Sequence, residues 1–224
     1  MFSISPTPFD LQFHLGRIPV RVHPGFWLVG IIGGWNPEDF RITFIWVVCL
    51  FASILIHELG HALTAEAFDW PSEILLYHFG GLAFSQRYHN NTPWRSIAVS
   101  LAGPGAGFAF YALIQAVVLF AGRTAWMRDP YVREAILQLS YINLWWGLVN
   151  LAPVLPLDGG RVCESFLEWL RVRNAEQRVL QISLIVGGLM AWWFLTHHNR
   201  FAGMLFLFLT LNNFSSLQET RRRW

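Results

Sequence analysis

Repeated long apolar runs constrain this 224-residue chain more than any other feature. A helix needs about 20 mostly apolar residues to cross the hydrocarbon core of a bilayer. Apolar runs occupy residues 24–35, 42–68, 97–121, 136–154, 179–195 and 201–214. The first is short and rich in glycine, so we expect it to span only by extending back through Ile18, Val20 and Val22. The runs predict an all-α polytopic membrane protein with about six transmembrane helices.

Composition supports this prediction and excludes other classes. Charged residues make up 13% of the chain, about half of their usual share in a soluble domain, and hydrophobic residues make up 54%. Such a chain is not disordered, not a secreted disulfide scaffold and unlike most soluble enzymes. All 16 basic residues are arginines and are scattered along the chain. The net charge is only +2, so we expect no nucleic-acid partner; the partner is the lipid bilayer.

Arginine also predicts the orientation of the spans. With six helices, eleven of the sixteen arginines fall on the side that holds both termini and the connections after the second and fourth spans. Cytoplasmic segments carry the excess of basic residues, so both termini should face the cytoplasm. The N-terminal segment lacks the pattern of a cleaved signal peptide, and we expect the first apolar helix to direct insertion. No connection is long enough for a second folded domain, which predicts one membrane-embedded domain over residues 1–224.

The second apolar run contains the sequence H-E-L-G-H, which gives His57, Glu58 and His61. Two histidines four residues apart lie on one face of a helix and can bind the same zinc ion. Glu58 would sit beside that ion to take a proton from water. Ionisable residues inside an apolar helix are costly and are usually functional. The alternative is a polar cluster that hydrogen-bonds neighbouring helices.

A third zinc ligand is expected 97 residues beyond His61, at Asp158. Pro153 and Pro156 break the apolar helix before it, and two glycines after it allow a tight turn that could aim the carboxylate into the protein. The alternative for Asp158 is an N-cap of a helix over residues 161–170. Glu164 and Glu168 are rival ligands, but they lie among arginines and have the pattern of a solvated face.

Taken together, these motifs resemble those of the site-2 protease family (M50 type) of intramembrane zinc metalloproteases. The matching sequences are H-E-L-G-H at 57–61 and N-L-A-P-V-L-P-L-D-G-G at 150–160, with weaker likeness in L-A-G-P-G at 101–105 and in the loop 77–83. The resemblance covers about residues 17–164, and the chain is similar to compact members without PDZ or CBS modules. It implies that His57, His61 and Asp158 bind one zinc ion per chain. It also implies that Glu58 is the general base and that Asn150 helps to position the substrate.

The expected function is therefore a zinc endopeptidase that cleaves a transmembrane or membrane-anchored protein within or near the bilayer, in its cytoplasmic half. A short strand or hairpin after the second span, joined through Gly80 and Gly81, could pair with the unwound substrate. A plain structural connector is the alternative for that hairpin. We expect packing roles for Cys49 and His78, although the loop that carries His78 could fold toward the zinc. Rival functions are a zinc-binding membrane transporter and an inactive relative that binds membrane helices.

Overall fold

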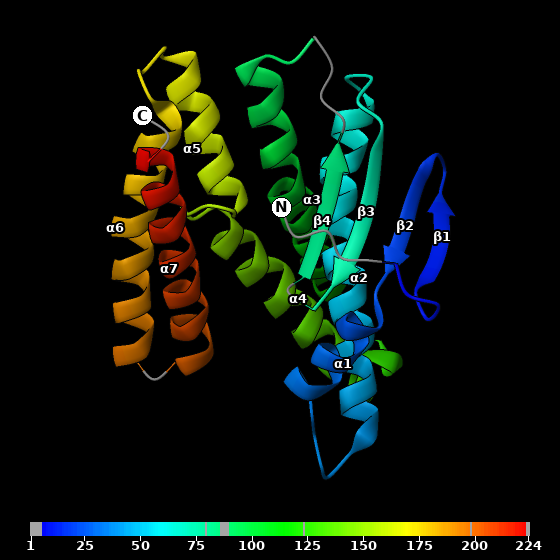
Figure 1. Cartoon of the computed structure of the whole chain (residues 1–224). Helices are drawn as coiled ribbons and strands as arrows, with labels where there is room; N and C mark the ends of the chain where they lie inside the picture. Colours follow the sequence, from blue (N-terminus) through cyan, green and yellow to red (C-terminus); the bar gives the residue numbers. More distant parts are fainter. Residues whose placement is uncertain (1–5, 79, 86–89, 123, 198, 223–224) are drawn as a thin grey trace. The chain divides into compact units, whose positions relative to one another are not determined.

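The computed structural model describes residues 6–78, 80–85, 90–122, 124–197 and 199–222. Its elements run in the order β1 (Leu11–Leu15), β2 (Ile18–Val22), α1 (Pro24–Gly33), α2 (Phe40–Glu66), β3 (Ser72–Tyr77), β4 (Gly80–Ser85), α3 (Pro93–Ala121), the short 3-10 helix η1 (Ala125–Arg128), α4 (Pro130–Asn150), α5 (Asp158–Trp169), α6 (Ala175–Thr196) and α7 (Arg200–Arg222) (Figure 1). The chain is mostly helical with one small sheet, and the short strand expected after the second apolar run is present. Phe79, in the loop 77–83, lies outside the described residues.

Three of the described helices are long and apolar enough to cross a membrane: α2 with 27 residues, α3 with 29 and α6 with 22. Each begins a few residues before the apolar run that predicted it, because its first helical turn includes charged residues, such as Arg41 in α2 and Arg95 in α3. In α2, for example, the Asp39 side chain accepts a hydrogen bond from the Arg41 N–H and caps the helix. The membrane location of the chain is thereby supported by helices of spanning length.

A four-stranded sheet in the order β1-β2-β3-β4 corrects one prediction. Residues 18–22 form strand β2 and do not extend the first apolar helix, so this prediction is wrong. Ile18, Val20 and Val22 alternate with Pro19 and Arg21, and this period of two buries one face of a strand. Their three side chains pack in one core with Ile54, Phe26, Ile74 and Leu76. Strand β2 also pairs in parallel with the distant β3, a pairing that the local sequence does not reveal.

The last two helices form a second core. α6 and α7 lie side by side as a hairpin (Figure 1). Phe206 and Leu209 from α7 and Ala191 from α6 pack there with Ala152 and Val154. The segment just before α5 therefore rests on the apolar face of this hairpin.

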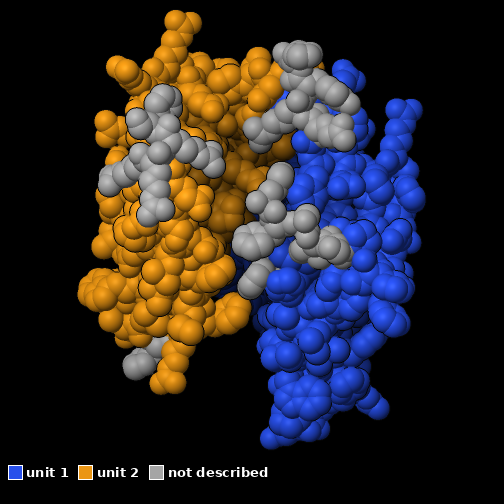
Figure 2. Space-filling view, in the orientation of Figure 1, with its two compact units in different colours: residues 1–89, 102–147 blue, residues 90–101, 148–224 orange. Residues whose placement is uncertain are grey.

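Two compact units make up the chain (Figure 2). Unit 1 comprises residues 1–89 and 102–147, and unit 2 comprises residues 90–101 and 148–224. Two of the three boundaries between them fall inside α3 and α4, and the third, between residues 89 and 90, precedes α3. Unit 1 contains the sheet and α2, whereas unit 2 contains α5, α6 and α7. The expectation of one membrane-embedded domain remains a prediction.

Candidate metal centre

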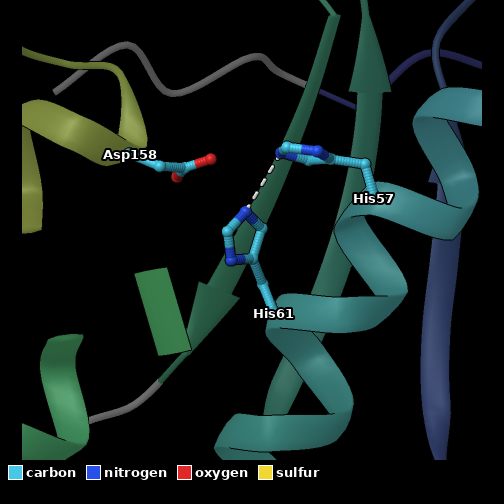
Figure 3. Close-up of side chains that lie close together, drawn as sticks. All are labelled: His57, His61 and Asp158. Carbon is cyan, nitrogen blue, oxygen red and sulfur yellow. Dashed lines mark hydrogen bonds between the residues drawn. The ribbon is translucent and has the colours of Figure 1, made fainter. Parts of the chain in front are cut away.

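His57 and His61 lie one helical turn apart on the same face of α2, within unit 1. Both are buried, with exposed fractions of 3% and 8%, and their Nε2 atoms are 3.2 Å apart. Figure 3 shows the two imidazoles turned toward each other from successive turns. Two nitrogens in a tetrahedral zinc site, each about 2.05 Å from the metal, are separated by about 3.3 Å. The imidazole pair therefore has the spacing that a zinc ion requires.

Glu58 is also buried, and a strand lies directly against its carboxylate. A Cβ atom built on Gly81 of β4 would overlap the Cγ and Oε1 atoms of Glu58. The preceding residue, Gly80, has a φ of +122°, and a Cβ atom built on it would lie 3.0 Å from the Trp146 ring. Only glycine adopts this backbone conformation without strain. The structure thus brings Gly81 to Glu58 and gives Gly80 a conformational role.

Gly103 on α3 is a site residue whose role the sequence did not predict. A Cβ atom built on it would overlap Nε2, Cε1 and Cδ2 of the His61 ring. A Cβ atom built on Gly60 of α2 would likewise overlap the Ala102 carbonyl oxygen and would lie 2.8 Å from the Ala106 Cβ atom. The small residues of the L-A-G-P-G segment thus let α3 pack closely on α2. What local sequence could not reveal is that the neighbour is the histidine pair.

Asp158 is the first residue of α5, in unit 2, and its side chain is buried. Leu157 occupies the N-cap position, so Asp158 is not the helix N-cap that the sequence left open. The backbone around Asp158 is tightly folded because two glycines follow it. A Cβ on Gly159 would overlap the Leu151 carbonyl oxygen, and one on Gly160 would lie 2.6 Å from the Leu155 nitrogen. The two glycines predicted to allow a tight turn therefore pack on the backbone that precedes α5.

His57 and His61, in unit 1, and Asp158, in unit 2, each offer one buried ligand atom that could bind a metal ion (Figure 3). Two imidazole nitrogens and one carboxylate oxygen, all buried, are the ligand types of a catalytic zinc site that keeps its fourth position open. No second group of three such side chains occurs among the described residues. The donor set therefore fits a catalytic zinc ion.

The other candidates have different surroundings. Asn150 is buried at the C-terminal end of α4, in unit 2. His78 lies beyond β3, where its ring contacts Tyr77 with centroids 5.2 Å apart, and it is not part of the metal-binding group. Cys49 is buried in α2, and its thiol donates to the Ala135 carbonyl at 3.7 Å, which agrees with a packing role. In α5, burial and then the charge of Glu164 raise the pKa of the Cys163 thiol, which stays protonated at neutral pH.

Comparisons with known proteins agree with this geometry. The model of "Peptidase family M50" matches residues 45–135 and 127–194. Among curated relatives, protein sll0528 of Synechocystis is 39% identical over 189 residues, which is 76% of this chain and 47% of that protein. "Stage IV sporulation protein FB" of Bacillus subtilis is 30% identical over 210 residues, 90% of this chain and 67% of its own length.

Two further matches come from Methanocaldococcus jannaschii. "Zinc metalloprotease MJ0392" of Methanocaldococcus jannaschii is 30% identical over 158 residues, 69% of this chain and 44% of that protein. The chain thus spans roughly half the length of most of these relatives. Among solved structures, "Site-2 Protease from Methanocaldococcus jannaschii" is similar with a TM-score of 0.64 at 24% identity. The alignment covers 93% of this chain and 95% of that one, so the two share a fold.

Proposed function

Because this chain belongs to peptidase family M50, a family of zinc metalloproteases, we propose that it is an intramembrane zinc endopeptidase. Its substrate is a transmembrane or membrane-anchored protein, which it cleaves within or near the bilayer. One observation carries this proposal: His57, Glu58 and His61 are buried together on α2, a helix of membrane-spanning length. Polar side chains at such a place are costly unless they bind or react.

In the proposed site, His57, His61 and Asp158 hold one zinc ion per chain. The two imidazoles come from adjacent turns of α2 and the carboxylate comes from the first turn of α5. A zinc ion there would supply Lewis acidity, which makes water a nucleophile near neutral pH and polarises the scissile carbonyl. The remaining steps belong to side chains of this protein.

Glu58 is the proposed general base. Its carboxylate accepts a proton from the attacking water and then delivers that proton to the nitrogen of the leaving amine. Atoms balance, since the water adds OH to the carbonyl carbon and H to the amine as the C–N bond breaks. Asn150 has the amide group to hold the substrate backbone, as the resemblance implies. Its Nδ2 group can donate to a carbonyl and its Oδ1 atom can accept from an N–H.

A substrate helix must unwind before it is cut, because its own hydrogen bonds protect its peptide bonds. The unwound segment then needs new partners for its N–H and C=O groups. Strand β4 is the last in the order β1-β2-β3-β4, and among the described strands it pairs only with β3. We propose that the substrate adds as an extended strand to the edge of β4 opposite β3, beside Gly80 and Gly81. The close approach of Gly81 to Glu58 would bring that substrate to the base.

The proposed membrane arrangement has both termini in the cytoplasm, which requires the N-terminal segment to cross the bilayer through strand β2 and the 10-residue α1 together, since α1 alone is too short. α2 would then run from outside to inside, which places His57 and His61 in the cytoplasmic half of the bilayer. This orientation rests on the excess of arginine in the segments assigned to the cytoplasm.

Zinc content and cleavage of a single-span test substrate, measured on detergent-purified protein, test the proposal. Glu58→Gln should keep about one zinc per chain but lose cleavage by about 10²- to 10⁴-fold, the usual contribution of a general base. His61→Ala should lose both zinc and cleavage, and Asp158→Ala should bind zinc more weakly and lose cleavage. Glu168→Ala, which removes a carboxylate from the same helix as Asp158, is the matched control and should change neither. Full zinc in Asp158→Ala would contradict the ligand set, and cleavage by Glu58→Gln would contradict the role of the base.

A further inference from the structure

Both backbone polar groups of Leu155, three residues before Asp158, are held by side chains from the last two helices. The Leu155 N–H donates to Ser183 Oγ of α6 at 3.0 Å. The Leu155 carbonyl accepts from Asn213 Nδ2 of α7 at 2.7 Å. All these residues belong to unit 2.

Ser183 and Asn213 are unusual residues for their places. Ser183 has an exposed fraction of 0% and Asn213 of 4%, and both lie among apolar side chains of the α6–α7 hairpin. Polar side chains buried at membrane depth persist where they satisfy another polar group. Asn213 Nδ2 uses one of its hydrogens on the Leu209 carbonyl of its own helix and the other on Leu155. The hydrogen bonds between Leu155 and the side chains of Ser183 and Asn213 thus join α6 and α7 to a loop and not to each other.

Leu155 is rigidly connected to the first turn of α5. A Cβ on Gly160 would lie 2.6 Å from the Leu155 nitrogen, and the Leu157 N–H donates to the Val154 carbonyl at 2.9 Å. The apolar side chain of Val154 is completely buried in the core formed with Phe206 and Leu209. A shift of the Leu155 backbone would therefore move Gly160. It would also move Asp158, which lies two residues before Gly160.

We propose that Ser183 and Asn213 are positioning residues that fix the Asp158 carboxylate for metal binding by clamping the Leu155 backbone. This inference rests on the proposed function, in which Asp158 is the third zinc ligand. It makes the α6–α7 hairpin part of the metal-binding apparatus and not only a membrane anchor. Groups that hold a metal ligand in place commonly change metal affinity by 10- to 100-fold when they are removed.

Zinc affinity, measured by competition with a chelator, tests this role. Ser183→Ala and Asn213→Leu each remove one clamp bond while keeping most of the side-chain volume, and each should weaken zinc binding by about tenfold. Ser215→Ala and Asn212→Leu are matched controls, because they replace the same residue types at exposed positions of α7. The controls should bind zinc like the wild type. Unchanged zinc affinity in both clamp variants, with Asp158→Ala weakened, would overturn the positioning role alone.

The same substitutions in an Asp158→Ala background separate positioning from general destabilisation. If the clamp acts through Asp158, Asn213→Leu should have no further effect on zinc affinity once that carboxylate is gone. An equal loss in both backgrounds would overturn the proposal. If Asp158→Ala itself binds zinc like the wild type, the ligand set of the proposed function fails, and the clamp proposal falls with it.

Hydrogen exchange gives a second measurement that does not depend on zinc. In zinc-free protein, amides of residues 154–160 should exchange faster in Ser183→Ala and Asn213→Leu than in the two controls. Amides of α2 should exchange at the same rate in all four variants, which shows that the protein remains folded. Wild-type exchange over residues 154–160 in both clamp variants would contradict the clamp.

Discussion

Next to the histidine pair, Gly103 of α3 has no room for a side chain. Its Cβ position is occupied by the His61 ring, including the Nε2 atom that faces His57. Any larger residue must push either α3 away from α2 or the ring out of its rotamer. Because a zinc ligand must be held to within fractions of an ångström, a small displacement should matter.

Gly103→Ala should therefore weaken zinc binding by at least tenfold, measured by chelator competition. Gly105→Ala, two residues further along α3, has open space around its Cβ and is the matched control. In a helix interior, alanine is favoured over glycine by about 1 kcal/mol, so the control should keep its zinc affinity and melt slightly higher. Equal zinc affinity in Gly103→Ala and Gly105→Ala would contradict the argument.

At the scale of single residues, the amino-acid sequence predicts contacts within one helix but not contacts between two helices. His57, Glu58 and His61 could be recognised because their spacing of one turn is fixed by helix geometry. The contact of Gly103 with His61 depends on the packing of two helices, which no local spacing encodes. The same limit applies to Ser183 and Asn213, whose targets lie 28 and 58 residues away in the sequence.

At the scale of elements, β4 connects the sheet to the proposed base. Gly81→Ala would place a methyl group where the Glu58 carboxylate lies, so it should lower cleavage by about tenfold or more while zinc stays bound. Leu82→Val, on the adjacent position and the opposite face of the strand, is the control and should cleave normally. Cleavage of the test substrate and zinc content, measured together, check this. Loss of zinc in Gly81→Ala, or unchanged cleavage, would contradict it.

The helices were easier to predict than the strands. α2, α3 and α6 each match an apolar run, because a helix satisfies its own backbone hydrogen bonds and its bounds follow from local sequence. The hairpin of β3 and β4 was also expected from two glycines between apolar residues. β1 and β2 were missed, since a strand needs a partner, and the parallel partner of β2 lies some fifty residues away at β3. The alternation of Ile18, Val20 and Val22 with other residues indicated strand β2, but these residues were assigned to the apolar helix that follows them.

At the scale of the whole molecule, the orientation in the membrane can be tested with single cysteines. In a background with Cys49 and Cys163 replaced by serine, Glu38→Cys should react with a membrane-impermeant maleimide on intact cells. Gln12→Cys and Gln218→Cys should react only after the cells are opened. The reason is that arginine-rich segments stay on the cytoplasmic side. The side chains of Gln12, Glu38 and Gln218 are all exposed in the structure. Labelling of Gln12→Cys on intact cells would contradict the orientation.

Zinc should also contribute to the stability of the whole chain. A zinc ion that binds the folded chain and not the unfolded chain shifts the equilibrium toward the folded state. A ligand present at 1,000 times its Kd stabilises the folded state by about 4 kcal/mol. Chelation should therefore lower the thermal midpoint of the wild-type protein in detergent, measured by differential scanning fluorimetry.

The same chelator should leave the midpoint of His61→Ala unchanged, because that variant has no zinc to lose. Asp158→Ala should respond less than the wild type, since two histidines alone bind zinc more weakly than three ligands do. Glu58→Gln should respond like the wild type, because the base is not a ligand. A wild-type midpoint that does not move on chelation would mean that zinc does not stabilise the fold. A full response in Asp158→Ala would mean that the ion is held within unit 1 alone.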